Sequence, residues 1–203
     1  MKKMKEFRKI SVIGLGLIAS SICLTLRQKD PTIKIVGYDK DIAVRNRAKK
    51  IGLCEVESNL DNAVSGSQLI VLCVPVGQMQ AVTQRLKKII EPGITITDVG
   101  SVKLSVIEEI ESNIESVGGK YVPSHPIAGT ERSGPDAGYA GLFEGRWCIL
   151  TPTKKTNKKA LNSLETFWKF LGMKTKIMTP EHHDLVLAVT SHAPHLIAYT
   201  MVG

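Results

Sequence analysis

The stretch that most constrains the fold is residues 9–21, which read K-I-S-V-I-G-L-G-L-I-A-S-S. Its first half is a short β-branched run, the composition of a buried parallel strand. Gly14, Gly16 and Ala19 follow with the spacing G-x-G-x-x-A, and an apolar segment to Leu26 continues at helical length. A strand, a glycine turn and a helix in that order are the context that a dinucleotide-binding fingerprint requires. The alternative is one of the many glycine turns in α/β proteins that bind nothing.

Each position of this turn has its own physical role. Gly14 permits the tight turn, Gly16 lets the backbone approach a pyrophosphate, and the small Ala19 lets helix and strand pack closely. The first helical residues, Leu17 and Ile18, offer unpaired N–H groups and the positive end of the helix dipole to phosphates. We therefore predict that Gly14, Gly16, Leu17 and Ile18 contact a dinucleotide.

An acidic residue lies where the fingerprint needs one. Residues 33–38, I-K-I-V-G-Y, predict a second strand that ends at Asp39, roughly 20 positions beyond the glycines. A carboxylate there accepts hydrogen bonds from a ribose hydroxyl and repels a 2′-phosphate, which favours NAD over NADP. The alternative is that Asp39 caps a helix beginning near Ile42.

Strand and helix patterns alternate through the first 118 residues. Further strands are predicted at 68–74 and 94–97, and helices at 42–51, 60–64, 79–90 and 102–117. This alternation predicts a mostly parallel sheet covered on both faces, a Rossmann-type α/β domain. Val74, Pro75 and Asp98 follow two of these strands, at the carboxyl edge where such sheets bind ligands, so we predict that they contact the cofactor.

The pattern changes after residue 122. Residues 123–145 are rich in glycine, proline and polar residues, and long loops of this kind inside compact domains are usually functional. A strand at 147–150, a helix at 157–171 and a strand at 174–178 follow. Thr179 and Pro180 then open a helix whose pattern still runs at Gly203. We predict one domain at 1–178 and, at 179–203, the first helix of a truncated helical dimerisation domain.

Three clusters carry candidate catalytic groups. Ser101 follows the fourth strand, where it either points into the site or caps the next helix. His125 is fixed before a proline in a loop beyond a strand, which suits an acid–base group, although an exposed, idle histidine is the simpler alternative. In the last helix, His192 and His195 share one face and suggest a metal, but no convincing third ligand accompanies them. We predict no metal.

Charge and composition exclude several classes of protein. The net charge is +8, yet the lysines are dispersed and no nucleic-acid-binding signature appears. The uncharged run at 10–26 after a basic start resembles a secretory signal, but it contains two glycines and is short for a membrane span. Four widely spaced cysteines without a C-x-x-C pair indicate free thiols. We expect a cytoplasmic protein that binds neither nucleic acid nor membranes.

Five motifs together carry a family resemblance. They are G-L-G-L-I-A-S, T-D-V-G-S-V-K, S-H-P-I-A-G-T-E-R-S-G, I-L-T-P-T and S-H-A-P-H-L-I-A. In this order and with this spacing the chain resembles the prephenate dehydrogenase family of tyrosine biosynthesis, which includes arogenate and cyclohexadienyl dehydrogenases. The resemblance spans nearly the whole chain, and H-P-I-A-G-T-E is far more specific than the glycine motif.

The resemblance implies roles for individual residues. His125 matches the catalytic histidine of the family, and Ser101 matches the serine that hydrogen-bonds that histidine and the ring hydroxyl of the substrate. Glu131 matches an acid that gates or recognises substrate, and His195 matches a histidine of the substrate pocket. The neighbouring Thr130 and Ser191 are predicted to bind substrate with them.

The resemblance also implies a reaction and partners. Prephenate and NAD would give 4-hydroxyphenylpyruvate, carbon dioxide and NADH, with arogenate as the alternative substrate. Family members dimerise through a helical domain that also supplies an arginine for the substrate carboxylate, which nothing in this chain replaces. The rival interpretations are another Rossmann dehydrogenase with a helical partner domain, such as a 3-hydroxyacid dehydrogenase, and a catalytically silent NAD-binding module.

Overall fold

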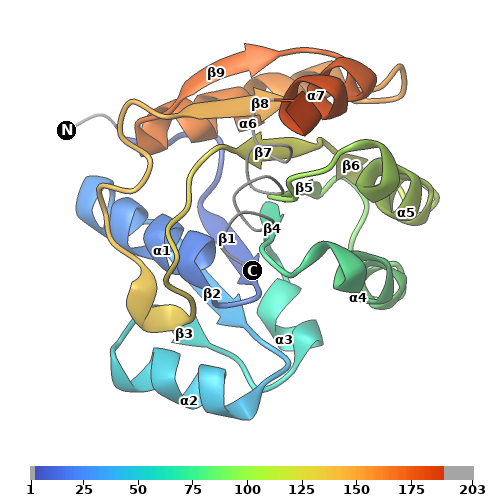
Figure 1. Cartoon of the computed structure of the whole chain (residues 1–203). Helices are drawn as coiled ribbons and strands as arrows, with labels where there is room; N and C mark the ends of the chain where they lie inside the picture. The colour runs from blue at the N-terminus through green and yellow to red at the C-terminus, as the bar shows by residue number, and fades with distance from the viewer. Residues whose placement is uncertain (1–2, 190–203) are drawn as a thin grey trace, which may run out of the picture.

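The computed structural model describes residues 3–189, and its centre is a six-stranded parallel sheet of order β3-β2-β1-β4-β5-β6 (Figure 1). The strands are β1 Lys9–Ile13, β2 Lys34–Tyr38, β3 Glu55–Val56, β4 Leu69–Leu72, β5 Thr95–Asp98 and β6 Lys120–Tyr121. The central strands β1 and β4 are apolar apart from Lys9 and Ser11, and all their residues except Lys9 are buried. Parallel strands buried on both faces require such near-continuous apolar runs, so the predicted Rossmann-type sheet is confirmed.

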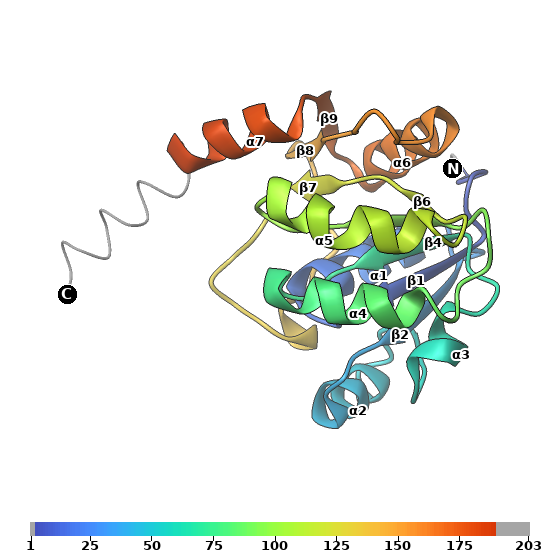
Figure 2. The same cartoon turned by 90° about the vertical axis from the view of Figure 1, so that its right-hand side faces the viewer.

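Helices cover both faces of this sheet (Figure 2). They are α1 Leu17–Lys29, α2 Ile42–Lys50, α3 Leu60–Val64, α4 Met79–Leu86, α5 Leu104–Glu115, α6 Lys158–Leu171 and α7 Pro180–Leu187, with short 3₁₀ turns at Val76–Gln78 and Pro135–Ala137. One hydrophobic core joins α1 and α6 to one face of the sheet. A second core joins α3, α4 and α5 to the other face.

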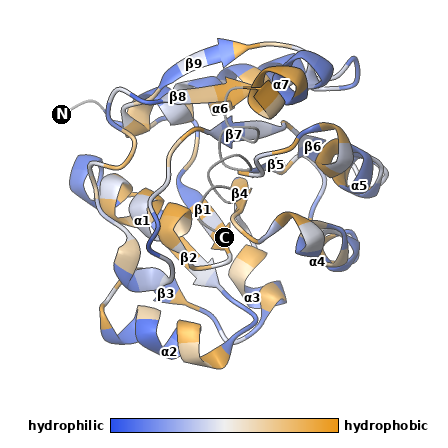
Figure 3. Cartoon of the chain, viewed as in Figure 1, coloured by the Kyte–Doolittle hydropathy of each residue, from blue (hydrophilic) through white to orange (hydrophobic). Residues whose placement is uncertain are grey.

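A second, three-stranded sheet of order β7-β8-β9 lies beside the first, with β7 Ser124–Pro126, β8 Trp147–Leu150 and β9 Lys174–Ile177. β7 is antiparallel to β8, and β8 is parallel to β9. The outer strand β9 is largely hydrophilic, whereas β8 is hydrophobic (Figure 3). Lysines on an edge strand protect it from pairing with other chains.

The structure corrects two predictions about the chain after β5. The stretch 123–145 was expected to be irregular, but it begins with β7, because Ser124, His125 and Pro126 pair with residues 148–150. The helix expected from residue 102 starts at Leu104. By contrast, α3, β8 and the start of α7 lie where the sequence predicts them, and Thr179 caps α7 by accepting from the His182 amide.

A segment at 127–146, here called the strap, leaves β7 and crosses α1 before returning to β8. Gly138 lies directly against α1, where a Cβ atom would come 2.8 Å from the Ser20 carbonyl carbon. Thr25 Oγ1 donates to the Ala140 carbonyl at 2.9 Å. Just before Gly138, the Arg47 guanidinium of α2 holds the Asp136 carboxylate through both of its oxygens. The strap therefore links the strand of His125 to two helices of the first sheet.

None of the helices within residues 3–189 is long and apolar enough to cross a membrane. All four cysteines are free thiols: Cys23 and Cys148 are buried, and Cys54 and Cys73 are half-buried. Residues 178 and 179 lie in the loop between β9 and α7, and the domain boundary placed there stays a prediction.

Candidate functional site

The glycine turn is held in place by backbone contacts to two neighbouring strands. Gly14 has φ +90°, and its N–H donates to the Tyr38 carbonyl at 2.8 Å. A Cβ atom at this position would lie 2.8 Å from the Cys73 carbonyl oxygen. Only glycine fits both the conformation and the space, because a side chain is strained at positive φ.

Gly16 differs from Gly14 because nothing lies within 4 Å of where its Cβ would be. It is the N-cap of α1, and no side chain caps that helix end. The first amides of α1 therefore keep their hydrogen-bonding capacity and their positive dipole for an anion. An open backbone surface at an uncapped helix start is the arrangement that suits a pyrophosphate.

Asp39 braces the same turn. One carboxylate oxygen accepts from the Leu15 amide at 2.8 Å, and the other accepts from the Asp41 amide at 2.9 Å. The cap of α2 is Asp41, whose side chain accepts from the Ala43 amide, so the alternative of Asp39 as the helix cap is wrong. Asp39 is half-buried at the end of β2 and keeps lone pairs for a ligand hydroxyl.

A cleft of about 500 Å³ opens over this turn. Five predicted cofactor residues line it: Gly14, Gly16, Asp39, Val74 and Pro75. Gly134 of the strap also lines it, as do Tyr38 and Gln78. Sequence reasoning missed Gly134 because only the path of the strap over α1 brings it there. Leu17 and Ile18 lie beside the cleft as the first residues of α1 and do not line it.

Asp98, for which a cofactor contact was expected, is fully buried at the end of β5 and does not line the cleft. Its carboxylate pairs with the equally buried ammonium of Lys103 and accepts from the Tyr121 hydroxyl at 2.8 Å. Burial, with the Asp98 charge beside it, raises the pKa of Tyr121, so this phenol stays a donor. Lys103 also donates to the Ser124 carbonyl at 2.9 Å. This buried ion pair fixes the strand that carries His125.

His125 lies on β7 at the carboxyl edge of the first sheet, since the adjacent Ser124 donates through its hydroxyl to the Asp98 carbonyl at 2.8 Å. The ring of His125 is 8% exposed, and its Nδ1 lies 2.9 Å from Nε2 of His183 in α7. Nδ1 of His183 lies 2.7 Å from Oδ1 of Asp184. The predicted His125 is therefore joined to buried His183 and, through it, to half-buried Asp184.

The pKa values of His183 and Asp184 are both shifted from their usual values. Burial lowers the pKa of His183, and the bond to Asp184 offsets only part of that effect. Burial alone would raise the pKa of Asp184, but hydrogen bonds from the Leu104 amide, from His183 and from the Lys103 amide outweigh it and lower the pKa. The folded protein therefore holds a neutral His183 against an ionised Asp184.

The lowered pKa of His183 predicts acid sensitivity. In the unfolded chain a histidine takes up a proton near pH 6.5, whereas folded His183 stays neutral to lower pH. The contribution of His183 to the free energy of unfolding should thus be complete above pH 6.5. It should fall as the pH decreases, by at most about 1.4 kcal/mol per pH unit. Urea titrations at a series of pH values measure this slope. His183→Asn should flatten it, while the exposed His182→Asn should leave it unchanged.

The remaining predicted site residues are exposed or lie outside the described residues. Ser101 is exposed after β5, and the N-cap of α5 is Lys103, so the alternative of Ser101 as a helix cap is wrong. Thr130 and Glu131 are exposed at the start of the strap. Ser191 and His195 lie outside the described residues. Among residues 3–189, no three histidine, cysteine, aspartate or glutamate side chains converge as a metal site needs.

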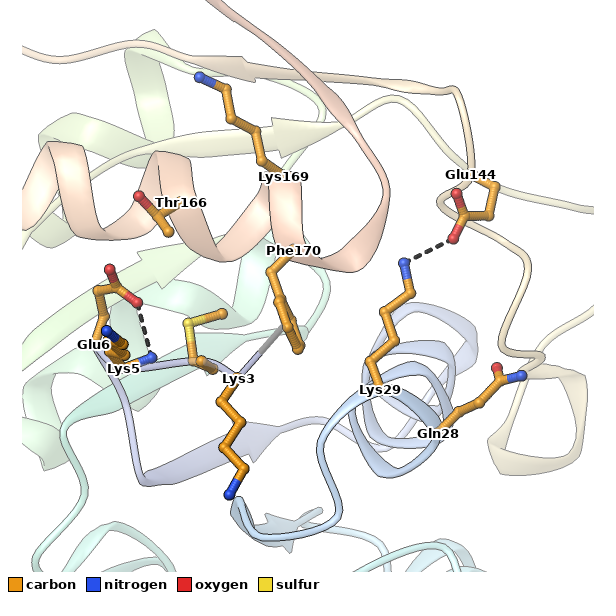
Figure 4. A pocket seen from close by; sticks show the side chains of 10 residues that line it. Lys3, Lys5, Glu6, Gln28, Lys29, Glu144, Thr166, Lys169 and Phe170 are labelled. Carbon is orange, nitrogen blue, oxygen red and sulfur yellow. Dashed lines mark hydrogen bonds and ion pairs between the residues drawn. The ribbon is translucent and has the colours of Figure 1, made fainter. Parts of the chain in front are cut away.

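A cavity of about 980 Å³, larger than the dinucleotide cleft, lies in a different place. It lies between the N-terminal segment, the end of α1 and α6, and Figure 4 shows Lys29 reaching Glu144 at its side. Phe170 forms part of its wall, and long lysine side chains surround it. It contains none of the predicted site residues, so size alone does not identify the functional cleft.

Comparison with known proteins decides the family. The family model described as "Prephenate dehydrogenase, nucleotide-binding domain" matches residues 22–177. The chain belongs to the prephenate dehydrogenase family. A cyclohexadienyl dehydrogenase from Zymomonas mobilis is 41% identical over 98% of this chain, and a prephenate dehydrogenase from Bacillus subtilis is 34% identical over all of it.

A solved prephenate dehydrogenase from A. aeolicus, in complex with hydroxyphenyl propionate and NAD+, superposes with a TM-score of 0.91 at 32% identity over 98% of this chain. The chain spans 70% of that structure, 68% of the Zymomonas dehydrogenase and 54% of the Bacillus one. The described fold therefore corresponds to the nucleotide-binding part of a prephenate dehydrogenase, with the cleft and His125 both contained in it.

Proposed function

We propose that the protein catalyses the NAD-dependent oxidative decarboxylation of prephenate to 4-hydroxyphenylpyruvate. The observation that carries the proposal is the position of His125, buried at the carboxyl edge of a sheet whose glycine turn forms a dinucleotide cleft. The A. aeolicus relative holds NAD+ and hydroxyphenyl propionate together, and that second ligand has the ring and side chain of a product-like molecule.

The cleft fits NAD+ on its own geometry. Open space over Gly16 and the uncapped start of α1 suit the pyrophosphate, and the Asp39 carboxylate suits the ribose hydroxyls. A 2′-phosphate would bring negative charge against Asp39. Arg45 lies nearby, but its guanidinium is engaged by the Asp39 and Lys40 carbonyls, so it does not offset this repulsion fully.

Substitution of the two glycines separates folding from cofactor binding. Gly14→Ala should destabilise the protein by about 1–3 kcal/mol, because alanine is strained at positive φ and would meet the Cys73 carbonyl. Gly16→Ala should leave stability within about 0.5 kcal/mol, because no protein atom opposes its Cβ. It should instead raise the Kd for NAD+ about tenfold, since the methyl group enters the space of the pyrophosphate. Equal stability losses in both variants would contradict this assignment.

The reaction needs a base and a hydride acceptor on opposite sides of one carbon. Bound NAD+ supplies the acceptor for the hydride on the carbon that carries the ring hydroxyl. Neutral His125 accepts the hydroxyl proton as that carbon becomes a carbonyl, and loss of the ring carboxylate as carbon dioxide gives the aromatic ring. The proton then returns from His125 to the phenolic oxygen. Aromatisation drives the step, and the base only has to be neutral and correctly oriented.

The other predicted residues complete the proposal. Ser101 follows β5 at the same edge as His125 and would hydrogen-bond the ring hydroxyl. Thr130 and Glu131 would contact substrate from the start of the strap, and Ser191 and His195 from the chain beyond α7. We further propose that the full-length protein is a homodimer formed through a C-terminal helical domain.

The test is NADH formation by the full-length protein, with prephenate and arogenate each offered with NAD+ and with NADP+. Turnover of prephenate with NAD+ is expected. Preference for arogenate would keep the reaction type but change the substrate, since both carry the same ring. Tight NAD+ binding without turnover of either compound would contradict the proposed reaction and favour a silent NAD-binding module.

A further inference from the structure

His183 and Asp184 form a rigid support behind His125. Both lie in the first two turns of α7, whose start is fixed by the Thr179 cap and by Pro180. The side chain of His183 is completely buried, and its ring meets that of His125 edge-on, with centroids 5.1 Å apart. Neither residue lines the dinucleotide cleft.

Asp184 is anchored on a second element. Its Oδ1 accepts from the Lys103 amide at 2.7 Å and its Oδ2 from the Leu104 amide at 2.9 Å, so the carboxylate caps the start of α5. An acid at a helix N-terminus is stabilised as the anion. Because an ionised carboxylate only accepts hydrogen bonds, the atom facing it on His183, Nδ1, must carry a proton.

The donor and acceptor in the bond between His183 and His125 follow from the bond between His183 and Asp184. Neutral His183 with a proton on Nδ1 has its lone pair on Nε2. Nε2 of His183 must then accept from Nδ1 of His125, which lies 2.9 Å away. A neutral His125 that donates through Nδ1 has its basic lone pair on Nε2.

We propose that His183 and Asp184 are positioning residues that fix the tautomer and ring orientation of His125, leaving Nε2 of His125 as the proton acceptor. The inference deepens the proposed function and rests on it for the identity of the proton donor. Within residues 3–189, the other charged groups that act on His183 are Lys103 and Asp98, which neutralise one another in their own ion pair. The orienting charge is therefore that of Asp184.

Asp184→Leu is the sharpest variant, because it removes Oδ1, the atom that accepts from both Nδ1 of His183 and the Lys103 amide. Without this acceptor the proton of His183 is no longer held on Nδ1. His183 can then donate through Nε2, and His125 would hold its proton on Nε2, which removes its basicity towards substrate. We expect kcat to fall on the order of 10²-fold with KM for NAD+ unchanged.

The tautomer can be measured directly by ¹⁵N NMR of histidine-labelled full-length protein, with the His125 signals assigned by their loss in His125→Asn. Wild-type His125 should show the proton on Nδ1, and Asp184→Leu should move at least part of it to Nε2. The exposed His182→Asn is the matched control and should change neither the spectrum of His125 nor kcat. A wild-type His125 protonated on Nε2, or an Asp184→Leu variant with wild-type tautomer and kcat, would overturn the inference.

A second pair of variants guards against loss of the α5 cap. His183→Gln retains a side-chain acceptor for His125 and a donor for Asp184, whereas His183→Leu retains neither, and both leave the Asp184 cap in place. Leucine should lower kcat strongly and glutamine should restore much of it; equal effects would contradict the inference. Since the NMR readout needs no substrate, a wild-type protein inactive on prephenate and arogenate would refute the proposed function while the tautomer still tests the histidine chain.

Discussion

His125→Asn should lower kcat on the order of 10²-fold or more while leaving the affinity for NAD+ unchanged. Asparagine provides no basic nitrogen for the ring hydroxyl proton, although its amide can still donate to Nε2 of His183. The cofactor cleft is untouched, because His125 does not line it. Steady-state kinetics with saturating NAD+, together with direct titration of NAD+ binding, measure the two quantities separately.

The control for this experiment is His182→Asn. His182 is exposed on the same helix as His183 and contributes only its backbone amide to the α7 cap, so kcat should not change. A His125→Asn protein that turns over within a few-fold of the wild type would remove His125 from the role of base. A parallel loss of NAD+ affinity would indicate that the substitution has disturbed the fold around β7.

Lys103→Met should destabilise the protein by about 3–5 kcal/mol, because it leaves the carboxylate of Asp98 buried without its counter-charge. The Ser124 carbonyl loses its donor in the same variant, so β7 should shift and any protein that still folds should have a lowered kcat. Urea unfolding monitored by circular dichroism measures the first effect, and the NADH assay measures the second.

Two comparisons make this prediction specific. In Asp98→Asn/Lys103→Met no uncompensated charge remains, so the double variant should lose less stability than the sum of the single variants. Lys34→Met removes the exposed ion pair with Glu55 that joins β2 to β3, and it should cost no more than about 1 kcal/mol. Similar losses of stability in Lys34→Met and Lys103→Met would mean that the buried ion pair matters no more to stability than the exposed one.

The features that the sequence predicted are those set by residues close together in the chain. The turn at Gly14 and Gly16, the strand ending at Asp39 and the cap at Thr179 depend on local conformation and on hydrophobic periodicity. The structure has all three. The buried strands β1 and β4 were equally predictable, because a short, nearly continuous apolar run rich in isoleucine and valine is typical of a buried parallel strand.

The features that were missed depend on contacts between distant segments. The cap of α5 comes from Asp184, 80 positions later, so nothing near Ser101 could indicate a helix start at Leu104. His183 reaches His125 across 58 positions, and no local sequence pattern links the two histidines. Asp98 follows a strand, as a ligand residue would, but Lys103 and Tyr121 claim its carboxylate once the chain folds.

The shared core beneath α1 limits how this chain can be cut or recombined. Phe7, which precedes β1, and Ile22 of α1 share a core with Phe167 and Trp168 of α6, a helix that lies between β8 and β9 of the second sheet. A fragment ending after β6 would keep every strand of the nucleotide-binding sheet but expose that apolar face to water. The nucleotide-binding half is therefore not a portable module, and breakpoints for fusion or domain exchange should fall after β9, not between the two sheets.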